Sequence, residues 1–138
     1  MFSVETKVGR LLEVRLKAPF APGEMEQLTL ALGAAFVRVP GRLVGCIDMR
    51  GSMLLSPEEG DHVAAWMRSG NAKIERSGVV IPQEAPVYLQ VARVFRETGH
   101  PGRRVFVEKT ELMSWLGEVL DDHERQRMQA FLDEDEEV

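Results

Sequence analysis

Residues 43–59 bring the side chains best suited to chemistry close together in the sequence. The apolar run Leu43 to Ile47 ends in Asp48, and after a short link Ser56-Pro57-Glu58-Glu59 begins a helical pattern. An acid that ends an apolar strand, followed by a capped helix, places polar groups at the carboxyl edge of a sheet, where open α/β folds keep their sites. An aspartate at this edge is suited to binding a cation, orienting a loop or contacting a partner.

Each of these polar residues also has a structural role open to it. An aspartate readily accepts hydrogen bonds from the amides that follow it, here those of residues 49–51. Ser56 followed by Pro57, with Glu59 three residues on, is what a helix N-cap with a capping box requires. The structural role is favoured for both Asp48 and Ser56. The neighbouring Arg50 and Ser52 are expected to be exposed in the same loop. The candidate partner-binding residues are Asp48, Arg50, Ser52, Ser56, Glu58 and Glu59.

A second candidate is the one local concentration of basic residues, between positions 93 and 104. It could meet a phosphate, an acidic partner or the acidic end of the chain itself. Solvated charges at a helix end and a strand start are the simpler account, because Arg93 and Arg96 lie opposite the apolar stripe of their helix. The members of this candidate anion or acidic-partner patch are Arg93, Arg96, Arg103 and Arg104.

Other chemistries find little support in the residue pattern. His62, His100 and His123 are far apart and show no metal-ligand spacing, so we expect no metal and no cofactor. The chain has no nucleophile elbow, phosphate-binding loop or dinucleotide-binding glycine motif. Its single cysteine, Cys46, lies inside an apolar strand pattern, which excludes an intramolecular disulfide. We therefore expect a protein that is not an enzyme.

Composition and charge narrow the class of partner. The chain has 138 residues, 44% of them hydrophobic, which suits one domain with a real core. Its net charge is -5, and the five acids of residues 133–137 account for that excess over the 17 basic residues. A neutral body does not attract nucleic acid, so DNA and RNA are not expected partners. A terminal block of like charges is typical of a solvated end, and we expect residues 133–138 to be disordered.

Neither a signal peptide nor a membrane-spanning stretch is expected. The first ten residues contain Glu5 and Lys7 and lack an apolar core, and no later apolar run approaches the length needed to cross a bilayer. We expect a cytoplasmic protein with no membrane partner.

Hydrophobic periodicity predicts alternating strands and helices. Two alternating segments around Gly9 predict a hairpin, and the consecutive apolar residues of 43–48 predict a central strand that is covered on both faces. Spacings of three and four predict helices between the strands, and Met128, Phe131 and Leu132 predict either a fifth helix or an extension of the fourth. That last helix either packs on its own body or exposes a face suited to a homodimer. The predicted strands are 2–8, 11–16, 43–48, 77–81 and 104–107; the predicted helical faces are 25–39, 57–68, 87–98, 112–120 and 121–132.

This order, ββαβαβαβα(α), predicts an α/β fold with a mixed, mostly parallel sheet of about five strands. In this order, and in several of its segments, the chain resembles the STAS family, in particular its SpoIIAA-like branch. The resemblance covers residues 2 to about 120. It rests on the hairpin, the strand ending Ile47-Asp48, the helix opening at Ser56, the segment Glu75-Arg76-Ser77-Gly78-Val79-Val80, and Arg104-Val105-Phe106 before Trp115-Leu116.

The resemblance implies a non-catalytic module, residues 1–120, that binds a regulatory protein. In the best-known members, phosphorylation of a serine at the start of the second helix switches partner binding, and Ser56 is its counterpart by position. This sequence departs from the family's usual Asp-Ser-Ser/Thr-Gly setting, because Leu55 precedes Ser56 and two glutamates follow Pro57. The cap is therefore favoured over the switch.

Two alternatives come from other functional classes. The fold also resembles that of Sec14-type lipid-transfer proteins, which implies a carrier of a small apolar ligand or lipid. A cryptic enzyme is the third and least favoured function.

Overall fold

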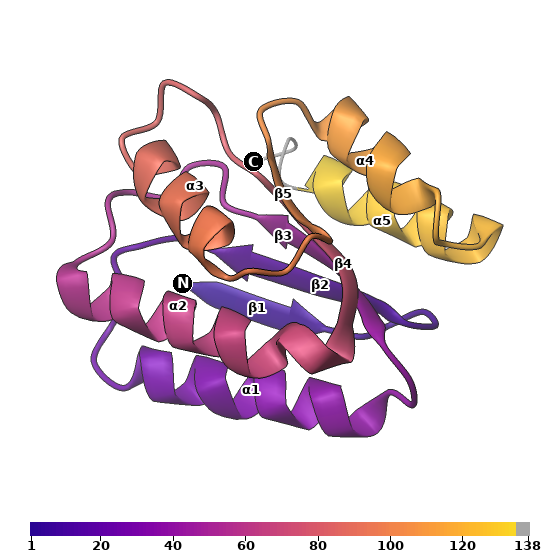
Figure 1. Cartoon of the computed structure of the whole chain (residues 1–138), viewed down its shortest axis with the longest axis horizontal. Coiled ribbons are helices and arrows are strands. Elements are labelled where there is room, and N and C mark those ends of the chain that lie inside the picture. The colour runs from indigo at the N-terminus through magenta and orange to yellow at the C-terminus, as the bar shows by residue number, and fades with distance from the viewer. Residues whose placement is uncertain (135–138) are drawn as a thin grey trace.

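The amino-terminal residues form the hairpin that their alternation predicts, and it builds one edge of a five-stranded sheet (Figure 1). The structure is a computed structural model and describes residues 1–134. The strands are β1 Phe2–Glu5, β2 Leu11–Leu16, β3 Leu43–Asp48, β4 Ile74–Val80 and β5 Arg103–Phe106. They lie side by side in the order β1-β2-β3-β4-β5. β1 is antiparallel to β2, and the other neighbours are parallel.

Five α-helices cover the sheet, and a short 3-10 turn, Asn71–Lys73, leads into β4. The helices are α1 Glu24–Arg38, α2 Pro57–Gly70, α3 Tyr88–Glu97, α4 Lys109–Gly117 and α5 Asp122–Glu134. Helices α1 to α3 lie on one face of the sheet, and α4 and α5 lie on the other (Figure 1). The predicted α/β class, mixed sheet and element order are confirmed.

The core is split into two layers by the sheet. Neighbouring residues of β3 point to opposite layers: Leu43 packs under α1 to α3, whereas Val44 and Cys46 pack under α4 and α5. Side chains of β3 are buried on both faces, as expected for a central strand whose apolar residues are consecutive.

The last helix folds back on the body. Its apolar residues Met128, Phe131 and Leu132 are buried in the layer beneath α4 and α5. The expectation that this face could serve a homodimer is therefore not supported, because the sheet already covers it. The helix also extends beyond its predicted end, since Asp133 and Glu134 belong to α5 and not to a disordered tail. Residues 135–138 of that predicted tail lie outside the described residues.

A capping box separates α4 from α5. The amide of Glu124 donates to Asp121 Oδ1 at 2.8 Å, and the amide of Asp121 donates to Glu124 Oε1 at 2.9 Å. Glu124 Oε2 also accepts the amide of Arg10 at 2.8 Å, so one carboxylate starts α5 and holds the turn between β1 and β2 against it. This capping box explains why the chain makes two helices here and not one.

Candidate functional site

Asp48 lies at the carboxyl end of β3, as predicted, but its side chain is 0% exposed. Its Oδ1 accepts the amide of Arg50 at 2.9 Å and Arg50 Nε at 3.0 Å, and its Oδ2 accepts Arg15 Nε at 3.3 Å. The first of these bonds is the turn-forming role that an aspartate favours. Asp48 is therefore not placed to contact a partner, and the expectation that it does is corrected.

The two arginines that surround Asp48 bind the end of α5. Arg50 Nη2 donates to the carbonyl of Leu132 at 2.6 Å, and Arg15 Nη2 donates to the carbonyl of Phe131 at 2.7 Å. Carbonyls near a helix C-terminus attract cations, because they carry the negative end of the helix dipole. Arg50, which we expected to be exposed in a loop, is instead largely buried and turned toward α5.

Ser52 is also inside the protein. Its Oγ accepts the amide of Ala18 at 3.0 Å and donates to the carbonyl of Met53 at 3.1 Å. The hydroxyl thus fixes the loop after β3 to the segment that follows β2. Of the predicted contact residues, Asp48 and Ser52 are buried, and the expectation that Ser52 is exposed is corrected.

Ser56 caps α2 with a complete capping box. Its Oγ accepts the amide of Glu59 at 3.1 Å, and Glu59 Oε1 accepts the amide of Ser56 at 2.8 Å. The other oxygen of Glu59 accepts the amide of Phe20 at 3.0 Å, so this carboxylate also ties the helix start to the chain after β2. The predicted cap is confirmed.

The start of α2 lies at a surface hollow of about 270 Å³. Phe20, Glu26 and Met25 line it from the segment that opens α1, and Ser56, Glu58 and Glu59 line it from α2. Three of these six side chains are carboxylates, so the hollow is suited to a basic or polar group. A phosphate on Ser56 would be repelled by them.

Three large apolar side chains near this edge are exposed, and the sequence reasoning did not single them out. Met53 and Leu54 are 63% and 55% exposed in the loop before α2, and Leu89 is 76% exposed in α3. The side chain of Gln90 joins the loop to α3, because it accepts the amide of Leu55 at 2.9 Å and donates to its carbonyl at 3.0 Å. We call Met53, Leu54 and Leu89 the apolar edge. The signal available in the sequence was that Leu89 falls outside the inner stripe of its helix.

The four arginines of the predicted anion patch do not converge. Arg93 pairs with Glu97 at 2.9 Å on the exposed side of α3, where Arg96 is also exposed. Arg103 and Arg104 are neighbours in β5 and point to opposite faces of the sheet: Arg103 bonds the end of α2, whereas Arg104 lies 4.9 Å from the ring centroid of Trp115 in α4. The four side chains therefore do not form one patch: those of Arg93 and Arg96 are solvated, as the simpler account expects, and those of Arg103 and Arg104 are separated because side chains alternate along a strand.

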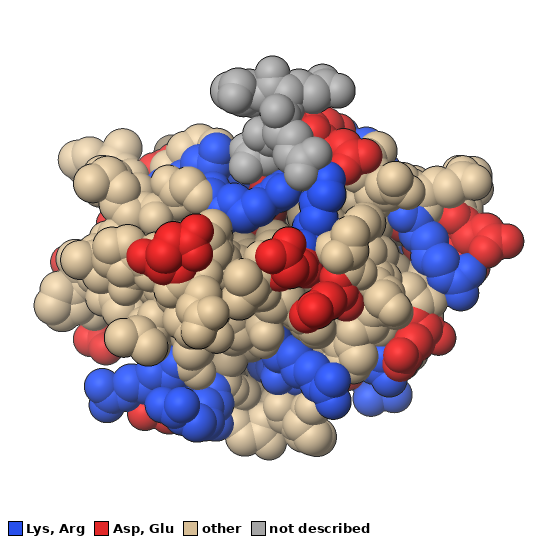
Figure 2. All heavy atoms as spheres, turned by 90° about the horizontal axis from the view of Figure 1, so that it is seen from above, with Lys and Arg blue, Asp and Glu red and all other residues tan. Residues whose placement is uncertain are grey.

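Charge and metal-ligand groups give no other site among residues 1–134. The face seen in Figure 2 carries basic and acidic side chains interspersed with uncharged surface. Within the described part of the chain, no three histidine, cysteine, aspartate or glutamate side chains are grouped to hold a metal ion. His100 has a structural role, since its Nδ1 accepts the amide of Gly102 at 2.8 Å and its Nε2 lies 2.8 Å from the carbonyl of Ile74.

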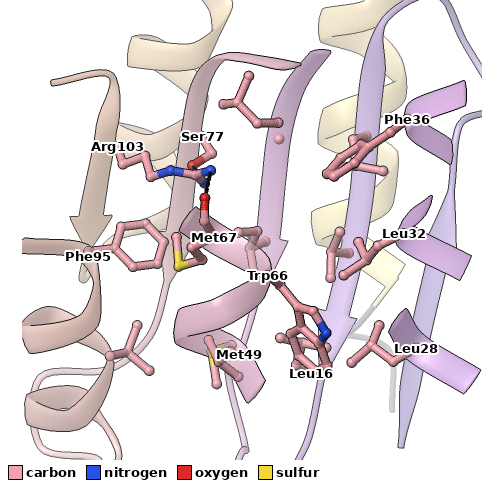
Figure 3. Close-up of a pocket in the computed structure, with 17 residues that line it drawn as sticks. Leu16, Leu28, Leu32, Phe36, Met49, Trp66, Met67, Ser77, Phe95 and Arg103 are labelled. Atoms are coloured by element: carbon pink, nitrogen blue, oxygen red, sulfur yellow. Dashed lines mark hydrogen bonds between the residues drawn. The ribbon is translucent and has the colours of Figure 1, made fainter. Parts of the chain in front are cut away.

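A cavity of about 70 Å³ lies between the sheet and helices α1 to α3 (Figure 3). Its walls are apolar side chains of all three helices and of β2 to β4, and its polar members are Ser77 and Arg103. Arg103 Nη1 donates to Ser77 Oγ at 2.8 Å, Nη2 to the carbonyl of Met67 at 2.9 Å, and Nε to Asn71 Oδ1 at 2.9 Å. Burial lowers the pKa of Arg103 to about 10. The guanidinium remains charged at neutral pH, although its three acceptors are neutral.

None of the helices in residues 1–134 combines the length and the apolar character needed to cross a membrane.

Comparison with known proteins gives no further information about this site. No protein-family model, no curated protein and no solved structure was found to match the chain.

Proposed function

We propose that this chain is a non-catalytic protein-interaction module of the SpoIIAA-like STAS type, and that it binds a regulatory protein in the cytoplasm through its apolar edge. The order of strands and helices supports the family, since a leading hairpin followed by alternating helices and parallel strands is the arrangement from which the resemblance was drawn. The observation that carries the contact surface is the exposure of Met53, Leu54 and Leu89 at one end of the sheet.

An exposed apolar group beside charged residues is typical of a protein-binding surface. The loop that carries Met53 and Leu54 is held at both of its ends, by Ser52 on one side and by the cap at Ser56 on the other. A surface held in this way loses little conformational entropy on binding. Glu58, exposed at the start of α2, provides an acidic rim that suits a partner with basic residues around an apolar centre.

The proposed surface keeps only part of the predicted contact set. Ser56, Glu58 and Glu59 border it, whereas Asp48, Arg50 and Ser52 support the loop from inside. In this proposal Ser56 is a fixed helix cap and not a phosphorylation switch. Its Oγ already accepts an amide, and the side chain of Glu59 lies against its backbone.

A pull-down with the full chain tests the contact surface. We expect a regulatory protein to be captured by the wild type and lost, by at least tenfold in recovered amount, with the double variant Met53→Asp, Leu54→Asp. The matched control is Leu30→Asp, which alters an equally exposed leucine on the outer side of α1. Equal recovery by the double variant and the control would place the contact elsewhere.

A second experiment separates the cap from the switch. Ser56→Ala should lower the free energy of unfolding by about 1 kcal/mol, whereas Ser56→Asp should retain most of it, because aspartate also caps helices. Both variants should bind the captured partner as the wild type does. A tenfold change in affinity with Ser56→Asp alone would instead support phosphorylation at this position.

The alternative of a lipid carrier receives less support. Sites for drug-sized ligands measure about 300–1,000 Å³, and the apolar cavity beneath α1 to α3 measures about 70 Å³. A lipid would require these helices to move away from the sheet. A copurified lipid detected by native mass spectrometry would revive this alternative.

A further inference from the structure

We propose that the cavity beneath α1 to α3 binds a short-chain carboxylic acid, with the carboxylate on Arg103 and the hydrocarbon chain among the apolar walls. This inference goes beyond the proposed function and concerns a different part of the molecule. The apolar edge lies at the carboxyl ends of the strands, whereas Arg103 begins β5. Figure 3 shows Arg103 and Ser77 at one end of the cavity, with Leu28, Leu32 and Phe36 on its far side.

The chemical nature of the cavity walls points to an amphiphile. Apolar side chains form the rest of the lining, contributed by residues such as Val14, Ile47, Val63 and Val91. The apolar part of such a cavity favours hydrocarbon over water. A guanidinium at one end adds a single recognition point, which a purely apolar ligand would leave unused.

The unusual feature is that Arg103 has hydrogen-bond acceptors but no counter-ion. Its partners are a hydroxyl, a backbone carbonyl and an amide oxygen, and no carboxylate of the described residues forms an ion pair with it. Three of its five N–H groups are used in these bonds, which leaves one hydrogen on each terminal nitrogen. The two terminal nitrogens are the pair that binds a carboxylate end-on.

Two other partly buried arginines, Arg127 and Arg15, are paired differently. Arg127 donates to both oxygens of Glu13, at 2.9 and 2.8 Å, and Arg15 donates to Asp48. Removing a cation from water is costly unless an anion or several good acceptors replace the water. The carbonyl of Met67, in the last turn of α2, supplies part of this compensation through the helix dipole. A ligand carboxylate would supply the rest.

The size of the cavity limits the ligand. About 70 Å³ is several times the roughly 10–15 Å³ that one water requires, and about half of an engineered apolar cavity of roughly 150 Å³ that binds benzene. Half of that volume corresponds to roughly half of benzene's carbon atoms, so an acid of roughly two or three carbon atoms, acetate or propionate, matches it on that comparison. A long-chain fatty acid does not.

The seam between α1 and α2 offers a way in. Leu32 and Phe36 of α1 and Trp66 of α2 line the cavity and are only partly buried. Trp66 Nε1 donates to Thr29 Oγ1 at 2.7 Å, which closes one part of the seam with a single side-chain bond. Rotation of Trp66 away from Thr29 would open the cavity without unfolding either helix.

A titration with propionate, followed by NMR on the full chain, tests the proposal. We expect saturable shifts of the Arg103 Nε–H and of the Ser77 and Val91 amides. Propionamide, which has the same shape but no charge, should bind at least tenfold more weakly, and octanoate should not bind more tightly than propionate. Equal binding of propionamide, or no saturable binding by propionate at tens of millimolar, would overturn the proposal.

Amino-acid substitutions test whether Arg103 and the cavity form the binding site for the carboxylate. Arg103→Met should reduce propionate affinity at least tenfold, whereas Arg104→Met, which alters the neighbouring arginine on the opposite face, should leave it unchanged. If Arg103→Met does not fold, Leu32→Phe provides the same test, because it fills the cavity at its partly exposed side and leaves Arg103 intact; it should reduce affinity at least fivefold. Unchanged binding by Leu32→Phe, or loss of binding by Arg104→Met, would place the anion on the surface.

Discussion

The two faces of the sheet bury charge in opposite ways. Beneath α4 and α5, Glu13 and Asp48 are 1% and 0% exposed, and each is held by arginines. Beneath α1 to α3, Arg103 lines a cavity, and its partners among the described residues are all neutral. The first face is closed by ion pairs between elements that are distant in sequence, and the second has an unfilled volume beside an unpaired charge.

This difference indicates that the elements on the face beneath α4 and α5 are held in one fixed arrangement. A buried ion pair adds little net stability compared with apolar packing, but breaking it is costly, so it holds its elements in one arrangement. The pair between Arg127 and Glu13 fixes α5 on β2, and Glu13 raises the pKa of Arg127. Among residues 1–134, no buried ion pair of this kind joins α1 to α3 to the sheet, and a bound carboxylate would give Arg103 the anionic partner that these residues do not provide.

Replacing one arginine on each face by methionine should give the largest effect, and it tests directly whether the two faces differ in how they hold buried charge. Arg127→Met leaves the carboxylate of Glu13 buried without its cation and should lower the free energy of unfolding by about 3–5 kcal/mol. Arg103→Met leaves only neutral acceptors and should cost about 1–2 kcal/mol. Urea denaturation of both variants measures the difference.

Cys46 gives this experiment a local readout. It lies on the α4–α5 face, and burial raises the pKa of its thiol far above the ordinary range, so it should react slowly with thiol reagents in the native protein. Arg127→Met should speed its labelling, whereas Arg103→Met should not. Equal losses of stability in the two variants would contradict the contrast between the faces.

Two glycines test how tightly each face is filled. A Cβ added at Gly78 would lie 2.3 Å from Leu112 Cδ1 beneath α4, whereas one added at Gly45, which lines the cavity, would meet Ser77 Cβ at 3.2 Å. Overpacking costs about 1–3 kcal/mol, so Gly78→Ala should lose that amount and Gly45→Ala less than about 1 kcal/mol. Thermal denaturation of the two variants measures the gap, and the reverse order would show that the cavity face is the more tightly packed.

Local patterns predicted most of the fold, because they act over a few residues. The consecutive apolar residues of β3 predicted a strand that is covered on both faces, and Ser56 with Glu59 predicted a helix start that the structure confirms. Helix caps and strand alternation depend on neighbours within about four positions, which a single sequence displays directly.

The candidate site was harder to predict, because its residues are buried by distant segments. Asp48, Arg50 and Ser52 were expected in an exposed loop, but Arg15 and the carbonyl of Leu132 reach them from other parts of the chain. No local spacing encodes these contacts. The separation of Arg103 and Arg104 requires no distant contact. Strand alternation, which a single sequence displays, places such neighbouring residues on opposite faces of the sheet.

The partly exposed ion pair between Arg10 and Glu75 should have the smallest effect, and thus limits the comparison to more deeply buried charge. Arg10 Nη1 lies 2.5 Å from Glu75 Oε1, and this hydrogen bond is the main reason that the pKa of Glu75 is lowered from its ordinary value of 4.5. A carboxyl with a lowered folded-state pKa contributes stability above pH 4.5 and loses it as the pH falls through the lowered value. Glu75→Gln should therefore cost at most about 1 kcal/mol at pH 7, and the difference from wild type should shrink toward zero in strong acid. Urea denaturation at pH 7 and below pH 3 measures both ends. A cost as large as that of Arg127→Met would mean that ion pairing in general, and not its burial beneath α5, holds this molecule together.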